Sequence, residues 1–129
     1  MNVAVFENEY EGLKNSFEAL SILEFDGELK FKYYPKFESF GPISKISQSD
    51  FAIVDLELAK NSQYDGFQVI SMIEKEKEKQ KVLKPKILIM SGKKDLLEKL
   101  KNDSSFEHPI LIKPIDYNQF TKELKLTED

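Results

Sequence analysis

An unbroken apolar run at residues 51–54 is followed at once by Asp55. Apolar residues without polar alternation are typical of strands in the interior of a parallel sheet. Three further runs of the same kind occupy residues 3–6, 87–90 and 109–112. The pattern therefore predicts four apolar strands, one of which ends in a carboxylate.

The segment at residues 29–33 differs, because its apolar side chains alternate with lysines. Such alternation predicts a strand with one solvent-exposed face, or a strand at the edge of the sheet. Lysines on an edge strand also discourage pairing with a second chain. Pro35 closes the segment, since proline cannot continue the hydrogen-bonded ladder.

Between the strands, apolar residues recur at steps of three and four, the spacing of an amphipathic helix. Four such stripes are present: Tyr10, Leu13, Phe17 and Leu20; Phe67, Ile70 and Ile73; Leu96, Leu97 and Leu100; and Tyr117, Phe120 and Leu124. Asn8 with Glu11 predicts a capping box for the first helix, and Asp26–Gly27 predicts its end. Asp116 with Gln119 predicts a capping box for the last helix.

Residues 36–49 are the exception to this regularity, because Gly41–Pro42 interrupts any long helix. We expect a single short helix there, anchored by Ile43 and Ile46. With this segment counted as a crossover, the chain consists of five βα units in strict alternation.

Strict alternation predicts an α/β fold, a doubly wound (βα)5 arrangement in which a parallel sheet carries helices on both faces. The strand at 29–33 fits an edge position, whereas those at 3–6, 51–55 and 87–90 fit the interior. We therefore expect a five-stranded sheet of order 2-1-3-4-5. Because we find no internal repeat or linker, residues 1–129 are expected to form one domain.

Composition narrows the range of partners. The formal net charge is −4 and the isoelectric point is near 5.2, which argues against nucleic acid as a direct partner. The absence of cysteine excludes disulfides and thiolate chemistry. No basic start precedes an apolar run, and no apolar stretch is long enough to cross a bilayer. We therefore expect a cytoplasmic protein that does not enter a membrane.

Chain polarity brings the candidate chemistry to one place. In a parallel sheet all strands end on the same side, and ligands bind outside those ends where the strand order reverses. The polar residues at these ends are Glu7 and Asn8 after the first strand, Asp55 after the third, Ser91 after the fourth and Lys113 after the fifth. We expect their side chains to converge on one rim of the sheet.

The residue types at this rim suit phosphoryl chemistry. Crowded oxygen ligands favour a hard cation such as Mg²⁺. The Asp55 carboxylate can act as a nucleophile towards phosphorus and form an aspartyl phosphate. Lys113 and Ser91 then supply a positive charge and a hydroxyl to the transferred anion. The purely structural alternatives are a strand-ending acid, a solvated lysine and an ordinary Ser–Gly turn.

At this point the sequence resembles the receiver domains of bacterial two-component response regulators, the CheY-like superfamily, over essentially its whole length. The residues that carry the resemblance are the acidic segment after residues 3–6, Val54–Asp55, Asp65–Gly66, Ser91–Gly92 and Lys113–Pro114. None of these is specific alone, but the five occur in the right order at the ends of the right strands. The resemblance implies the flavodoxin-like receiver fold.

The resemblance also implies a role for each residue. Asp55 is similar to the phosphoacceptor, Ser91 to the switch hydroxyl, and Lys113 to the lysine that pairs with the phosphoryl group. The backbone carbonyl of Glu57 matches a Mg²⁺ ligand of the family, beside Glu7, Asn8 and Asp55. The implied partners are a sensor histidine kinase or a phosphotransfer protein, and a downstream protein. The downstream protein would read the face formed by the fourth helix, the fifth strand and the last helix.

Two positions depart from the family pattern. Asn8 stands where a carboxylate normally touches the metal, so we expect weaker Mg²⁺ binding, partly compensated by the longer Glu7. A helix N-cap is the alternative role for Asn8. Ile110 replaces the aromatic residue that often relays the signal. His108, the only histidine, is expected to be a surface residue without metal-ligand partners.

Two alternative functions follow from these departures and from the acids at residues 55 and 57. A pseudo-receiver would use the same fold as a phosphorylation-independent interaction module. An aspartate-dependent phosphohydrolase would use Asp55 and Glu57 as its paired acids, although such acids usually follow the first strand. A nucleotide- or flavin-binding role is disfavoured, because no glycine-rich loop follows the first strand.

Overall fold

A computed structural model describes residues 1–57, 64–102 and 107–125, without the side chains of Leu97 and Lys101. The elements in chain order are β1 (Asn2–Phe6), α1 (Glu11–Phe25), β2 (Lys30–Tyr34), the 3-10 helices η1 (Phe37–Phe40) and η2 (Ile43–Gln48), β3 (Phe51–Asp55), α2 (Gly66–Gln80), β4 (Lys86–Ser91), α3 (Lys94–Lys101), β5 (Ile110–Ile112) and α4 (Tyr117–Lys125). All strand pairs are parallel, and their order is β2-β1-β3-β4-β5. The predicted α/β fold and strand order are therefore confirmed. The expected apolar role of Leu97 lies outside the described side chains.

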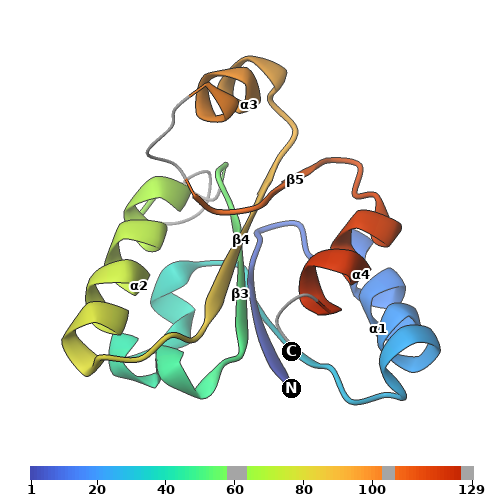
Figure 1. Ribbon diagram of the computed structural model, residues 1–129, viewed down its shortest axis with the longest axis horizontal. Helices are drawn as coiled ribbons and strands as arrows, with labels where there is room; N and C mark the ends of the chain where they lie inside the picture. The colour runs from blue at the N-terminus through green and yellow to red at the C-terminus, as the bar shows by residue number, and fades with distance from the viewer. Residues whose placement is uncertain (58–63, 103–106, 126–129) are drawn as a thin grey trace.

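Helices cover both faces of the sheet (Figure 1). Alternate residues of a strand point to opposite faces, so Val3 and Val5 pack with α1 and α4, while Ala4 and Phe6 pack with α2 and the 3-10 helices. Phe17 of α1 has no exposed surface, and its ring stacks on the rings of Phe31 in β2 and Phe120 in α4. The sheet is thus the middle layer between two apolar cores.

The central strand β3 lies between β1 and β4, and all five of its residues are buried. Strand β2 lies at the edge, with Lys30 and Lys32 exposed and Phe31 packed against α1. The predicted burial of residues 51–55 and the edge position of the lysine-rich strand are both confirmed. Asp55 therefore ends the most buried strand of the sheet.

Two of the described helices carry side-chain caps, of which only the Asp116 cap of α4 was predicted from the sequence. Asp65 caps α2 in a capping box with Gln68, with N–H to oxygen distances of 2.8 and 2.9 Å. The Asp116 carboxylate accepts the N–H groups of Asn118 and Gln119 at the start of α4. Both contacts satisfy backbone donors that have no partner within the helix.

The predicted cap of α1 is wrong. The helix begins at Glu11, and the residue before it, Tyr10, makes no side-chain capping bond. The chain leaves β1 through a turn at residues 8–10, which places Asn8 too early to reach the first free N–H groups of the helix. The end of α1 is as predicted, because Asp26 adopts a left-handed conformation with φ of 53°.

The crossover after β2 contains two 3-10 helices where a single short helix was expected. Gly41, with φ of 91°, and Pro42 separate the two. Phe37 and Ile46 are buried and fill the core beside β1 and β3. An α-helix is therefore unnecessary for core packing at this position, and the crossover covers only part of the sheet.

His108 is partly buried, which corrects the expectation of a surface residue. Its Nε2 atom lies 2.5 Å from the Glu74 Oε1 atom of α2. The contact connects the segment before β5 to α2. None of the described helices is both long and apolar enough to span a bilayer.

Candidate functional site

Asp55 stands at the carboxyl end of β3, between two strands that shield it. Only 1% of the residue is exposed, and its Cα partner in β4 is Met90. One carboxylate oxygen, Oδ1, accepts the backbone N–H of Glu57 at 3.0 Å. Helix α2 begins directly against this backbone, since a Cβ on Gly66 would lie 2.5 Å from the Asp55 carbonyl oxygen.

Glu7 follows β1, which is paired with β3, and lies beside Asp55 at the carboxyl ends of these two strands, as the sequence predicts. The residue is 1% exposed, and its Oε1 atom accepts the N–H of Glu9 at 3.1 Å. Asn8 is half-buried and lines a separate shallow hollow with Glu9 and the start of α1. The structure therefore brings Glu7 into the site, whereas the Asn8 side chain makes no hydrogen bond to any of the described residues.

Lys113 joins the two acids. Its Nζ atom lies 2.5 Å from Glu7 Oε2 and 3.1 Å from Asp55 Oδ2. Burial disfavours the charged lysine, but the Glu7 and Asp55 carboxylates outweigh this effect and raise the pKa of the ammonium. Glu7 just after β1, Asp55 at the end of β3 and Lys113 just after β5 thus form one ionic cluster, in which both acids are buried and the lysine is partly exposed.

Despite the contact with Lys113, the surroundings of Asp55 disfavour its ionised form. Burial raises its pKa, and the neighbouring Glu7 carboxylate raises the pKa further, while the hydrogen bond from Glu57 lowers it. Two acids that share one lysine leave a net negative charge at the site. A further cation beside Asp55 would therefore stabilise the ionised carboxylate.

Ser91 reaches the site through Glu57, a contact that the sequence analysis missed. The Ser91 hydroxyl donates to Glu57 Oε1 at 2.8 Å, and the N–H of Gly92 lies 3.3 Å from the same oxygen. Ser91 is fully buried, and its hydroxyl oxygen also accepts the N–H of Lys93. As a receiver residue, Glu57 was expected to contribute only its backbone carbonyl; its side chain was considered only as the second acid of a phosphohydrolase.

The oxygen atoms of this site are ligands of the kind that a hard divalent cation prefers. Carboxylate oxygens from Glu7 and Asp55 lie together, and Glu7 Oε2 is buried with no hydrogen bond of good geometry in the described part of the chain. The Lys113 ammonium, however, already contacts both acids. No group of three or more acidic, histidine or cysteine side chains suited to a metal occurs among the described residues. A cation would therefore bind to few protein ligands and share them with lysine.

The sequence matches no protein-family model, and no curated protein matches it. Solved structures match its fold. The signal receiver domain of the DNA-binding response regulator merR from Colwellia psychrerythraea 34H superposes with a TM-score of 0.73 at 18% identity, over 100% of this chain and 99% of that chain. The receiver domain of NtrX from Brucella abortus gives a TM-score of 0.68 at 12% identity, over 96% and 95% of the two chains.

A third similar structure contains a metal. It is the receiver domain of the sensor histidine kinase PA1611 from Pseudomonas aeruginosa PAO1, with a magnesium ion coordinated in the active site cleft. Its TM-score is 0.68 at 13% identity, over 97% of this chain and 94% of that chain. Together these likenesses show the fold: the chain has the flavodoxin-like fold that these receiver domains share.

Proposed function

We propose that this chain is a receiver module of two-component signalling that accepts a phosphoryl group on Asp55. The observation that supports this most strongly is the buried cluster in which Lys113 contacts both Asp55 and Glu7. Three strands supply these residues at the carboxyl edge of a receiver fold. A lysine beside a single buried nucleophilic carboxylate is the charge arrangement that phosphoryl transfer requires.

The proposed reaction is one displacement at phosphorus. An Asp55 oxygen forms a bond to the phosphorus of the donor, and the bond from phosphorus to the donor's leaving group breaks. Lys113 neutralises charge on the transferred group, at the 3.1 Å contact that it already makes with Asp55. One chain accepts one phosphoryl group, so the protein acts as an acceptor and not as a turnover enzyme.

Magnesium is part of this proposal. Glu7, Asp55 and the backbone carbonyl of Glu57, together with the Asn8 amide, supply the oxygen atoms that we propose for it. When bound, Mg²⁺ lowers the repulsion between the acids and an incoming phosphoryl donor. Since Asn8 brings no charge and Lys113 already contacts both acids, we expect the affinity for Mg²⁺ to be weak.

The signal is proposed to leave through Ser91. Its hydroxyl, held by Glu57 in this structure, turns to the phosphoryl group, and the loop after β4 follows. Lys113 N–H donates to the Ser91 carbonyl oxygen at 2.9 Å, so movement at Ser91 reaches β5 directly. The α3–β5–α4 face then changes, and a downstream protein binds one of the two states more tightly. The phosphoryl donor is a sensor histidine kinase or a phosphotransfer protein.

Incubation with acetyl phosphate and Mg²⁺, followed by intact-mass measurement, tests the proposal. We expect one added phosphoryl group on the wild-type chain and none on Asp55→Asn. Asp26→Asn, which makes the same exchange at an exposed position, should accept the group normally. Addition to Asp55→Asn at the wild-type level would contradict the assignment.

A phosphorylation-independent interaction module is the second candidate. Two observations favour it: Lys113 already offsets part of the charge of the two acids without a metal, and Asn8 makes no hydrogen bond within the described residues. Titration with Mg²⁺, followed by amide chemical shifts, separates the candidates. Saturable shifts at Asp55 and Glu57 support the phosphoacceptor, and unchanged spectra at high Mg²⁺ support the interaction module.

A further inference from the structure

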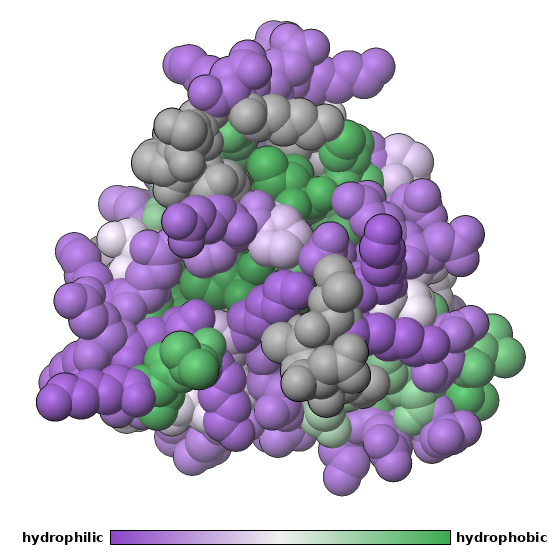
Figure 2. Space-filling model, in the orientation of Figure 1, coloured by the Kyte–Doolittle hydropathy of each residue, from purple (hydrophilic) through white to green (hydrophobic). Residues whose placement is uncertain are grey.

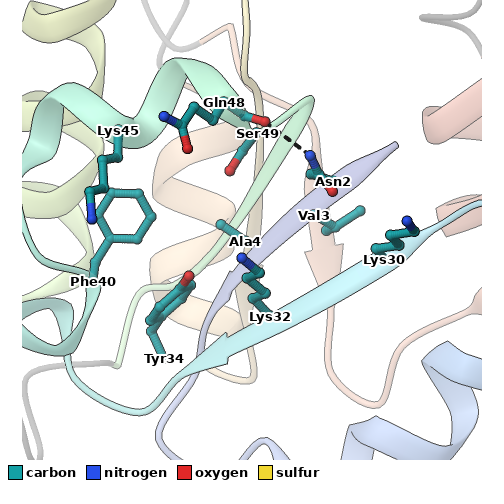
Figure 3. A pocket seen from close by; sticks show the side chains of 10 residues that line it. All are labelled: Asn2, Val3, Ala4, Lys30, Lys32, Tyr34, Phe40, Lys45, Gln48 and Ser49. Atoms are coloured by element: carbon teal, nitrogen blue, oxygen red, sulfur yellow. Dashed lines mark hydrogen bonds between the residues drawn. The ribbon is translucent and has the colours of Figure 1, made fainter.

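A polar cavity lies beside the first half of β1, over residues 2–4, and extends along β2 to Tyr34 (Figure 3). Its volume is about 190 Å³, and it is lined by residues of β1, β2, η1 and η2, with Ser49 just beyond. The lining residues that the argument uses are Lys30, Lys32, Tyr34, Phe40, Lys45 and Ser49. We call this the lysine cavity.

The lysine cavity follows from the strand pattern of β2 and from the short crossover. Residues two apart on a strand share a face, so Lys30, Lys32 and Tyr34 point away from α1. The 3-10 helices η1 and η2 cover this face only in part. Figure 3 shows Lys32 and Tyr34 projecting from β2 towards the segment that carries Lys45, with the Phe40 ring beside it.

The charge of this cavity is opposite in sign to the net charge of the chain. Three lysines and no acid line it, although the formal net charge is −4. Within the described residues, no acidic side chain forms an ion pair with Lys30, Lys32 or Lys45. The neighbouring Asp50 is occupied, because it accepts the N–H of Asn2 at 2.8 Å and lies 3.8 Å from the Lys84 ammonium.

Protection of the sheet edge explains only part of this charge. Lysines on β2 do oppose pairing with another chain. Lys45, however, belongs to η2 and faces the same cavity from the other side. Like charges gathered without a counter-charge repel one another, so an anion bound among them gains energy from each.

Hydroxyl groups and aromatic rings complete the cavity. Ser49 is 8% exposed, and none of the described residues forms a hydrogen bond with its hydroxyl. Burial raises the pKa of the Tyr34 hydroxyl, which therefore remains a proton donor. The rings of Tyr34 and Phe40 pack edge to face, with centroids 5.1 Å apart, and form an apolar wall beside the lysines.

We propose that the lysine cavity binds a phosphate-bearing small molecule. Lys30, Lys32 and Lys45 hold the phosphate as point charges, the Tyr34 and Ser49 hydroxyls donate to it, and the aromatic wall contacts the organic part. The cavity volume of about 190 Å³ favours a small ligand over a macromolecule. This site is distinct from the Asp55 cluster, because the cavity lining includes none of Glu7, Asp55 and Lys113.

The test is a titration of ¹⁵N-labelled protein with inorganic phosphate and, separately, with adenosine monophosphate, in EDTA. EDTA keeps phosphate from the Asp55 site, which is negatively charged without a metal. We expect saturable shifts of the amides of Val3, Lys32 and Tyr34, with tighter binding of the nucleotide. Equal affinity for both probes would also support the site and identify phosphate itself as the ligand.

Two triple variants provide the control. K30Q/K32Q/K45Q should weaken binding by at least about tenfold. K14Q/K75Q/K79Q removes the same charge at three exposed positions and should leave binding unchanged. An equal loss in both variants would overturn the proposal, as would shifts confined to Asp55 and Lys113. Shifts caused only by an oligonucleotide or heparin would also overturn it.

Discussion

At the scale of single residues, the site depends on one lysine that connects acids from distant parts of the sequence. Lys113 lies 58 residues after Asp55, yet its Nζ atom is 3.1 Å from that carboxylate. The sequence could predict this meeting, because the ends of parallel strands share one edge of the sheet. It could not predict the Glu57–Ser91 hydrogen bond, since side-chain rotamers depend on packing that a strand pattern does not contain.

Glu57 is expected to slow phosphorylation. Its carboxylate holds the Ser91 hydroxyl and adds negative charge beside the acceptor. A hydrogen bond to a charged group contributes about 1.5 kcal/mol, which corresponds to about tenfold in rate if it must break. Glu57→Ala should therefore accept a phosphoryl group from acetyl phosphate about three to ten times faster, as measured by intact mass over time.

Two further variants separate charge from hydrogen bonding. Glu57→Gln keeps an acceptor for Ser91 but removes the charge, so it should fall between the wild type and Glu57→Ala. Glu9→Gln removes a charge from the same rim without contacting Ser91 and should react at the wild-type rate. A slower Glu57→Ala would show that Glu57 assists the reaction instead.

The raised pKa of Asp55 predicts a pH-dependent stability. A folded-state pKa above the unfolded value means that ionisation of this carboxyl destabilises the fold. Asp55→Asn should thus raise the free energy of unfolding at pH 7, with a gain that shrinks as the pH falls through the folded pKa towards 3.8. Urea unfolding in EDTA between pH 4 and pH 7 measures this. Asp26→Asn, at an exposed position, should show no such trend; a gain that is constant with pH would contradict the prediction.

At the scale of elements, the strands were predictable and the second crossover was not. Unbroken apolar runs mark β1, β3 and β4 because both faces of these strands are covered. The apolar residues of the 3-10 helices, Phe37, Phe40, Ile43 and Ile46, recur at steps of three, which is the period of a 3-10 helix. Steps of three also occur in amphipathic α-helices, and Gly41–Pro42 divides the run, so the sequence did not predict two 3-10 helices.

Gly66 should be intolerant of a side chain. A Cβ there would lie 2.5 Å from both the Asp55 carbonyl oxygen and the Leu56 Cα, and both are backbone atoms. Gly66→Ala should therefore displace the backbone of Asp55 and Leu56 and lower the free energy of unfolding by about 1–3 kcal/mol in urea denaturation. Gly12→Ala, where nothing lies within 4 Å, should raise it by about 0.4–1 kcal/mol. Equal effects at the two positions would refute the close approach of α2 to β3.

At the scale of the whole molecule, the α3–β5–α4 face is suited to carry a signal. Figure 2 shows apolar surface below α3, over β5, with polar residues around it. Ile112 of β5 is 41% exposed there, one residue before Lys113. The site and this face are therefore covalently adjacent, although Ile110 offers no aromatic ring for a rotamer switch. The sequence could predict that adjacency but not the identity of the partner.

Beryllofluoride with Mg²⁺, a stable mimic of the phosphoryl group, should reveal the switch. We expect amide chemical-shift changes at Ser91 and Gly92 that continue into Ile110–Ile112, because Lys113 N–H bonds to the Ser91 carbonyl oxygen. Amides of Asn2 and Val3, at the start of β1, should remain unchanged. The same changes in Asp55→Asn would contradict a switch that begins at this residue.

The identity of the modified atom tests the central claim most directly. After treatment with acetyl phosphate and Mg²⁺, reduction with sodium borohydride converts an aspartyl phosphate to homoserine, which peptide mass spectrometry can locate. We predict homoserine at position 55 and at no other aspartate. Homoserine at another position, or a phosphorylated chain that resists reduction, would contradict the account.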